Sequence, residues 1–376
     1  MEHDLYNATL FPELETWEPV PDAVSLRMEG EFLTPTVTAR ATSFALTSRD
    51  LDIIYSVGIY KYLSIFQLQT LHFPNTQYYR TATNRIGSLV SAGLLSRVFY
   101  HQKLTAHTGR PASILYLQSE NLDTLATLLS RKARAALFAR FEDITPTNRD
   151  EFAYSFIIHE LGISDLYIAL ERSDRPQSLV FWERTSPKME GVTDKFRATV
   201  ETEDGTRTQT LTFNPDSFLC YRTPDNSLAF YFHEHDNNTE TNLHNLYRKY
   251  AGYLAFHKER RFPDLLRRFL NKHGIIIPDH LTNRVDFRVL TTAPDENRRD
   301  KLIREVNKLD NSDRFYFAAL PHVTPQMIHT AIWRKASDYD PIARAEKQLP
   351  RETKPSVRAR FIAERMSSLP SYALSD

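Results

Sequence analysis

Two carboxylates stand at matching distances from a turn in the segment NPDSFLCYRTPDNSLAFYFHEHD, residues 214–236. Hydrophobic runs flank the turn TPDNS and read as the two arms of a hairpin. A hairpin symmetric about that turn makes three cross-strand pairs: Cys220 with Phe230, Phe218 with Phe232, and Asp216 with Glu234. Like charges directly opposite each other destabilise a strand pair by up to about 1 kcal/mol, and desolvation adds to that cost. Some feature of the fold should therefore offset the repulsion.

Two kinds of chemistry would offset the repulsion between Asp216 and Glu234. One is a raised pKa, which would leave one of the two acids protonated. The other is a hard divalent cation such as Mg²⁺ or Mn²⁺, which takes carboxylate oxygens as ligands and activates water. Asp236 falls on the same strand face as Glu234 and is a third candidate metal ligand. The alternative is that both acids lie at solvent-exposed strand ends and have no chemical role.

The elements around this hairpin predict an α/β domain over residues 150–325. Helical patterns cover residues 152–172, 240–257 and 296–309, and strand patterns cover residues 178–185, 285–292 and 314–320. Together with the hairpin, the order is αβββαβ followed by a further helix and strand. This order predicts a mixed sheet with helices on its faces.

A second group of polar residues lies on a predicted helix over residues 76–93, TQYYRTATNRIGSLVSAG. Apolar residues recur on one of its faces at helical spacing. Another face carries side chains that can reach base edges or phosphates: Gln77, Arg80, Thr81, Asn84 and Arg85.

The order of elements around that helix is typical of a winged helix-turn-helix. Two short helices are predicted before it, at residues 48–62 and 63–73, and two strand-like runs follow it. In such a module, here residues 47–140 with a linker helix at its end, the third helix enters the major groove of double-stranded DNA. Lys103 and Arg110 lie between the strand-like runs and would contact phosphates. The alternative is a helical module that binds protein, and the linker helix could form a homodimer.

Composition sets wider limits. The chain has 376 residues with 47 basic and 47 acidic side chains, so local patches rather than total charge decide whether it binds a polyanion. The single cysteine, Cys220, excludes an intrachain disulfide and a Cys-rich zinc module and favours a cytoplasmic location. No signal peptide and no apolar run of about 18 residues occurs, so no membrane partner is expected.

Both ends of the chain are expected to lie outside the two domains. Residues 1–46 have little periodicity and are expected to form an N-terminal arm. Residues 326–376 are basic and have few large apolar residues over 334–363. They are expected to form an arm that is either extended, and able to hold nucleic acid by charge, or docked on the folded core.

The ordered motifs of this chain resemble those of the replication-relaxation family of plasmid and mobile-element proteins. The resemblance covers about residues 48–320 and rests on DLDIIYSVGIYKYLSIFQLQTLHF, AGLLSR, GRPASILYLQ, HELGISDLYIAL, FWER, PDSF, EHDNNTE, LYRKYAGYL and FRVLTT. It implies a DNA-binding protein that acts in plasmid replication and in relaxation of closed circular DNA. Replication or transfer proteins would be its partners.

The α/β domain also resembles the PD-(D/E)XK nuclease fold. By that resemblance Asp216 matches the acid of the PD motif, Glu234 the acid of the second motif, and Glu160 the acid on the first helix. The position of the motif lysine holds Asp236 instead, and Lys249 on the following helix is the candidate substitute. The resemblance implies metal-dependent phosphodiester hydrolysis that nicks DNA. The alternative is a catalytically inactive DNA-binding accessory factor.

A relaxase of the rolling-circle type is a further alternative. Such enzymes use two histidines that flank a hydrophobic residue on a strand, and a tyrosine that attacks DNA. His233 and His235 have this spacing, but the residue between them is glutamate. For the tyrosines of the next predicted helix, core packing is the favoured interpretation.

Overall fold

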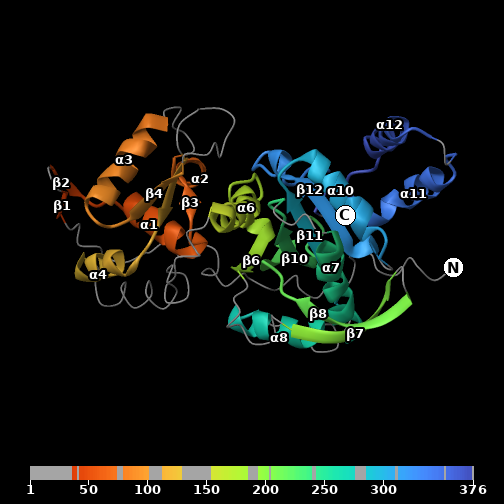
Figure 1. The fold of residues 1–376 in the computed structure, drawn as a ribbon. Coiled ribbons are helices and arrows are strands. Elements are labelled where there is room, and N and C mark those ends of the chain that lie inside the picture. The colour runs from red at the N-terminus through yellow and green to blue at the C-terminus, as the bar shows by residue number, and fades with distance from the viewer. Residues whose placement is uncertain are drawn as a thin grey trace. The chain divides into compact units, whose positions relative to one another are not determined.

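The structure is a computed structural model that describes residues 36–39, 42–73, 79–100, 112–128, 154–184, 194–202, 205–238, 243–275, 285–309, 312–350 and 353–374. These residues form two compact units, and the boundary lies between Ile168 and Ala169, inside helix α6 (Tyr154–Glu171) (Figure 1). Most of α6 therefore belongs to the N-terminal unit, which corrects the expectation that it opens the second domain. The physical reason is packing, because Ile157 and Leu161 of α6 lie in one buried cluster with Tyr62 and Ile114.

Within its described residues, the N-terminal unit contains a strand pair, four helices besides α6, and a small antiparallel sheet in the order β3-β5-β4. In chain order the elements are β1 (Thr36–Ala39), β2 (Thr42–Ala45), α1 (Ser48–Tyr60), β3 (Leu63–Ser64), α2 (Ile65–His72), α3 (Tyr79–Ser91), β4 (Ser96–Tyr100), β5 (Ala112–Tyr116) and α4 (Ser119–Leu128). The antiparallel pairing of β1 with β2 corrects the expectation of an irregular arm for residues 36–45. Their β-branched residues suit paired strands.

The first two helices begin at capping boxes. Thr47 caps α1 and exchanges hydrogen bonds with Asp50. Ser64 caps α2 in the same way with Gln67. Each box satisfies backbone N–H groups that the first helical turn leaves without partners. The capping boxes fix the residues at which α1 and α2 begin.

The C-terminal unit is built on a six-stranded mixed sheet in the order β13-β12-β11-β10-β9-β6. Its strands are β6 (Leu179–Arg184), β9 (Ser217–Arg222), β10 (Leu228–His235), β11 (Arg288–Ala293), β12 (Phe315–Ala319) and β13 (Arg334–Lys335). Strands β10, β11 and β12 are parallel, and the other neighbours are antiparallel. Helices α7 (Leu243–Lys258), α8 (Phe262–Lys272) and α10 (Glu296–Val306) pack on it around a core rich in phenylalanine. The predicted mixed sheet with helices is confirmed.

The hairpin of β9 and β10 has the predicted register. Phe230 lies opposite Cys220, and Phe232 lies opposite Phe218. The ladder ends where His233 faces Ser217, so Asp216 lies just before the first residue of β9. Both hydrophobic arms are buried almost throughout. The hairpin is therefore a central part of the sheet and carries its acids to one sheet end.

A strand pair and a helix within residues 194–272 were not predicted. Strands β7 (Asp194–Thr202) and β8 (Gly205–Phe213) form a separate antiparallel pair, and α8 follows α7 after a short turn (Figure 1). The ring of Phe213 stacks on that of Phe256 in α7, with 3.9 Å between centroids. A Cβ atom on Gly252 would lie 2.4 Å from the backbone oxygen of Thr212, so this glycine allows α7 to approach β8 closely.

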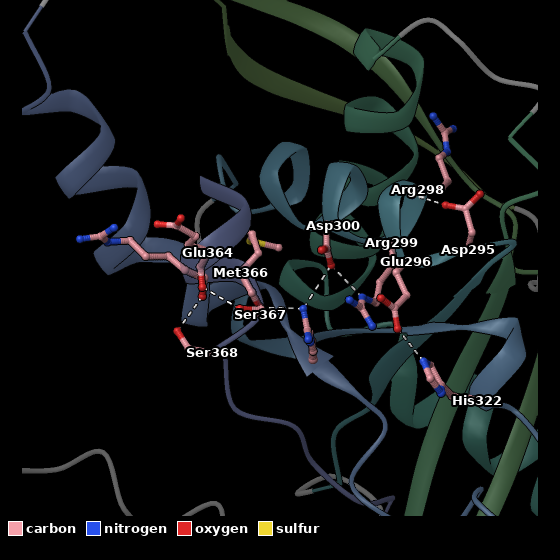
Figure 2. A network of polar contacts seen from close by, with 12 residues as sticks. Asp295, Glu296, Arg298, Arg299, Asp300, His322, Glu364, Met366, Ser367 and Ser368 are labelled. Atoms are coloured by element: carbon pink, nitrogen blue, oxygen red, sulfur yellow. Dashed lines mark hydrogen bonds and ion pairs between the residues drawn. The ribbon is translucent and has the colours of Figure 1, made fainter. Parts of the chain in front are cut away.

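The described residues of the C-terminal segment are docked on the core, which is one of the two alternatives that the sequence left open. Helices α11 (Asp340–Lys347) and α12 (Pro355–Met366) bury Ile342, Ile362 and Met366 in the main core cluster. Arg334 donates to the backbone oxygen of Met366 at 2.8 Å and lies 3.4 Å from Asp300 of α10. Figure 2 labels Met366 and Asp300 in the surrounding polar network. Apolar residues spaced along a basic segment account for the docking, since they bury while the charges stay outside.

The last described residues return to the sheet. Trp333 and Tyr372 form an isolated antiparallel bridge, with N···O distances of 3.0 and 2.6 Å between their backbones. The hydroxyl of Tyr231 in β10 donates to the backbone oxygen of Leu374, across 143 residues of sequence. These contacts make residues 372–374 part of the folded unit.

Candidate carboxylate site and helix surface

The backbone holds Asp216 beside the end of β10. Its N–H donates to the oxygen of His233 at 3.1 Å, and its Oδ2 accepts from the N–H of His235 at 2.7 Å. Asp216 is partly buried at this position. A carboxylate held by a backbone N–H is fixed in place and orientation, as a ligand or a charge must be at a binding site.

Glu234 is buried at the end of β10, with 1% of its side chain exposed. Lys249 Nζ forms an ion pair with Oε2, and the hydroxyl of Tyr253 donates to Oε1. Lys249 and Tyr253 are four residues apart on α7 and therefore lie on the same helix face. The structure thus brings together Asp216, Glu234 and Lys249, three of the four predicted catalytic residues, and adds Tyr253.

The charges of this site depend on one another. Burial raises the pKa of Glu234 well above its usual value, and the negative charge of Asp216 raises it further, while Lys249 and Tyr253 oppose the shift. Burial lowers the pKa of Lys249, but the charges of Glu234 and Asp216 outweigh burial and raise it overall. A raised acid pKa was one of the two predicted ways to offset the repulsion. The ammonium of Lys249 offsets the repulsion in a further way that the sequence analysis did not consider.

Two predicted site residues lie elsewhere. Asp236 binds Arg298 of α10 through both carboxylate oxygens, at 2.8 and 2.9 Å. Glu160 is buried on α6 in the N-terminal unit, whereas Asp216 and Glu234 belong to the C-terminal unit. Among the residues that the structure describes, no group of three or more His, Cys, Asp or Glu side chains could hold a metal ion.

The residues of the relaxase alternative are engaged in the interior. His233 and His235 are both buried, and each has a ring nitrogen 3.0 Å from the hydroxyl of Thr292 in β11. Tyr250 contacts the hydroxyl of Thr291 at 3.0 Å and packs against Phe315 and Phe317. This core packing is the interpretation that the sequence favoured for the tyrosines.

Sequence reasoning missed the roles of Tyr253 and Thr292 in this arrangement. The four-residue spacing from Lys249 was a usable signal for Tyr253, because it places both side chains on one face of a helix. No local signal identifies Thr292, since its contact with the histidines depends on the parallel pairing of β10 with β11.

Helix α3 exposes part of its predicted polar face. Arg80, Thr81 and Asn84 are exposed, and the opposite side of the helix is buried through Ala82, Ile86 and Leu89. Arg85 differs, because its Nε donates to Asp50 at 2.6 Å and its Nη2 donates to the backbone oxygen of Ala45 at 2.9 Å. Gln77, Lys103 and Arg110 lie outside the described residues.

The Arg85–Asp50 contact is structural in origin. Asp50 is fully buried and also belongs to the capping box of α1. Burial by itself would raise the pKa of Asp50, but the hydrogen bonds from Arg85 and Thr47 lower it below its usual value. The guanidinium therefore compensates a buried charge, and its predicted role in contacting DNA has to compete with this one.

A comparison of the sequence with protein families gives a match that includes both the carboxylate site and helix α3. The profile of a family described as replication-relaxation matches residues 54–265, more than half of the chain. The chain belongs to the replication-relaxation family. The match runs from α1 through α3 and the acid pair into α8, so both candidate regions fall within the family's shared sequence. The family's description points to a role in replication and relaxation of mobile-element DNA.

No curated protein and no solved structure gives a significant match to this replication-relaxation protein. None of the helices that the structure describes is long and apolar enough to cross a membrane.

Proposed function

We propose that this replication-relaxation protein binds double-stranded DNA of a plasmid or mobile element and nicks it by metal-dependent phosphodiester hydrolysis. The observation that carries the proposal is the placement of Asp216 and buried Glu234 at one sheet end, with Lys249 in contact with Glu234. Two acids and a lysine are the residue types that a nuclease of the PD-(D/E)XK type uses. Here the lysine comes from α7 instead of β10.

The donor set fits a hard divalent cation. Mg²⁺ is commonly held by one or two carboxylates together with water and substrate phosphates, and Asp216 and Glu234 provide two. In the structure the ammonium of Lys249 contacts Glu234 Oε2, and the hydroxyl of Tyr253 donates to Oε1. Asp216 and Glu234 would hold Mg²⁺ or Mn²⁺, which when bound would supply Lewis-acid stabilisation and an activated water.

The residues around the acids have roles of their own. Tyr253 orients Glu234 through its hydroxyl, and the backbone N–H of His235 orients Asp216. The ammonium of Lys249 lies where it can stabilise negative charge that develops on a phosphate near Glu234. Asp236 and Arg298 hold the end of β10 against the start of α10.

The N-terminal unit would supply DNA recognition. Its order α1-β3-α2-α3-β4-β5 supports a winged helix, in which α3 is the helix that enters the major groove. The exposed side chains of Arg80, Thr81 and Asn84 suit contacts to bases and phosphates. The exposed part of α3 thus supports the proposed DNA contact.

Incubation of supercoiled plasmid with the purified protein and Mg²⁺ or Mn²⁺ tests this proposal. Open circles are expected from the wild type, and a loss of at least about 100-fold in their rate is expected from Asp216→Asn and from Glu234→Gln. Glu364→Gln is the matched control, since it removes an exposed carboxylate on α12. Equal nicking by all four proteins would exclude the acid pair as the site of hydrolysis.

A DNA-binding accessory factor that does not cut is the second candidate. Two observations favour this second candidate. Asp236 occupies the position of the motif lysine, and the ammonium of Lys249 already compensates the charge of Glu234 without a metal ion. Binding of duplex DNA by the wild type and both acid variants, without open circles in any reaction, would support this function over hydrolysis.

A further inference from the structure

We propose that helix α8 and the turn before it form a second contact surface for duplex DNA, which holds the phosphate backbone next to the carboxylate site. We call this surface the α8 basic face and define it by Lys258, Arg260, Arg261, Arg268 and Lys272. The inference rests on the proposed DNA-directed function and assigns part of the binding to the C-terminal unit.

The sequence concentrates positive charge here. Residues 257–273, HKERRFPDLLRRFLNKH, contain six lysines and arginines but only two acids, whereas the whole chain has no net charge. Helix α8 is amphipathic, with apolar residues on one side and charged residues on the other. Its buried side consists of Phe262, Leu265, Leu266, Phe269 and Leu270. Its exposed stripe consists of Arg261, Asp264, Arg268, Asn271 and Lys272. The charges therefore stand on one face, which extends for about 16 Å along the helix.

The acids within this segment leave several cations without compensation. Asp264 pairs with Arg267 at 2.8 Å, and Glu259 lies 3.5 Å from Arg261. Lys258, Arg260 and Arg268 are exposed and have no ion-pair partner within the described part of the chain.

Helix α10 of the same unit provides the contrast. It also carries four cations, but Arg298, Arg299 and Arg304 face Asp236, Asp300 and Glu346 at 2.8, 2.8 and 3.9 Å. Arg298 and Arg299 are buried with these partners, and Arg304 is exposed but has an acid 3.9 Å away. The exposed Lys258, Arg260 and Arg268 of the α8 basic face have no such acid within the described residues, which leaves the positive charge that attracts a polyanion.

The α8 basic face leads to the sheet end that carries the acids. Lys272 Nζ lies 2.8 Å from Glu183, and His273 Nε2 lies 2.9 Å from the same carboxylate. Glu183 faces Phe218 across β6 and β9, two positions from Asp216. Burial would raise the pKa of Glu183, but its contacts with His273 and Lys272 lower it, so the ion pair is maintained at neutral pH. The end of α8 is thus anchored beside the candidate site.

Duplex DNA is the partner that fits both observations. Exposed cations, three of which have no acid partner in the described part of the chain, complement a regular row of phosphates, and neutralising phosphates releases counterions. An acidic protein would also be attracted, but it would have no reason to be guided to a site for phosphodiester hydrolysis.

Salt-dependent binding of the full-length protein to a duplex of about 30 base pairs tests the inference. The variant Lys258→Gln, Arg260→Gln and Arg268→Gln should weaken binding by roughly 10-fold or more near about 0.1 M salt, and should reduce the slope of log K against log salt by about 2 to 3. The control Lys301→Gln, Lys347→Gln and Lys354→Gln removes the same charge from exposed sites outside α8. It should lose much less.

Crosslinking provides a direct readout of position. The single cysteine, Cys220, is fully buried, so a thiol-specific photocrosslinker will label an introduced surface cysteine. Arg268→Cys should crosslink to duplex DNA, and Lys301→Cys should not.

The possible failures can be told apart. If the wild type binds duplex but the two triple variants behave alike and Arg268→Cys does not crosslink, the α8 basic face is excluded and the proposed function stands. If the wild type binds no duplex, the proposed function and this inference both fail.

Discussion

Lys249 compensates a carboxylate that lies deeper in the protein than its own side chain. Glu234 has 1% of its side chain exposed, whereas Lys249 retains 37%. The lysine thus reaches inward from the surface of α7 to a carboxylate whose charged form is disfavoured by burial.

A double-mutant cycle should detect this compensation. Lys249→Met should lower the free energy of unfolding at pH 7 by about 2 kcal/mol, because Glu234 is left without its cation. Combining Lys249→Met with Glu234→Gln should cost less than the sum of the single changes by roughly 1–2 kcal/mol. Urea denaturation of the four proteins measures the coupling. Additive effects would contradict the ion pair.

The buried pair of Asp236 and Arg298 should be strongly structural. Their side chains are 9% and 3% exposed, so Asp236→Ala leaves an uncompensated guanidinium inside the fold. A loss of about 3–5 kcal/mol is expected. Asp264→Ala, which breaks the exposed pair with Arg267, should cost less than about 1 kcal/mol. Urea denaturation of both variants checks this, and similar losses would refute it.

Two helical glycines should respond to alanine in opposite directions. Gly252→Ala forces a methyl group against the backbone of Thr212 and should destabilise the protein by about 2–3 kcal/mol. At Gly87 in α3, no atom lies within 4 Å of the place that a Cβ atom would take, so Gly87→Ala should stabilise by roughly 0.5–1 kcal/mol. Thermal melting of each variant gives the sign. A neutral Gly252→Ala would mean that α7 and β8 can separate freely.

Asp165 should make the N-terminal unit less stable as the pH rises. Burial raises its pKa to about 6 from 3.8, and the hydrogen bond from Gln67 opposes the shift. A carboxyl whose pKa is raised by folding contributes stability below its unfolded pKa and loses it as the pH rises through the folded pKa. The loss therefore falls between pH 3.8 and about 6.

Asp165→Asn keeps the oxygen that accepts from Gln67 and removes the charge. Relative to the wild type, the free energy of unfolding of this variant should be about 1–2 kcal/mol higher at pH 8 and little changed at pH 4, where Asp165 is largely protonated. The gain is kept small because Asp165 is partly exposed. Unfolding free energies at the two pH values provide the measurement. An equal effect at both would show that the charge of Asp165 plays no part.

The sequence predicted those features of the fold that depend on neighbouring residues. The turn between Cys220 and Phe230 set the hairpin register, because hydrophobic arms of equal length admit one symmetric pairing. That register alone placed Asp216 beside Glu234. Helical spacing likewise identified the buried and exposed sides of α3.

Other features depended on contacts between distant residues and could not be predicted. The pairing of Asp236 with Arg298 spans 62 residues and removed Asp236 from the predicted metal ligands. The partner of Arg85 is Asp50, 35 residues away. No pattern in the local sequence links this acid of α1 to an arginine of α3. The sequence could not choose between an extended and a docked C-terminal segment, because docking rests on a few apolar residues, including Ile342 and Ile362.

The return of residues 372–374 to the sheet has a consequence for biosynthesis. Tyr231 reaches Leu374, and Trp333 pairs with Tyr372, so β10 and the last described residues depend on each other. A growing chain that has already exposed β9 and β10 still lacks these partners until residue 374 has left the ribosome. The C-terminal unit therefore cannot be completed before residue 374 has emerged, and nascent chains must keep their hydrophobic strands from aggregating in the meantime.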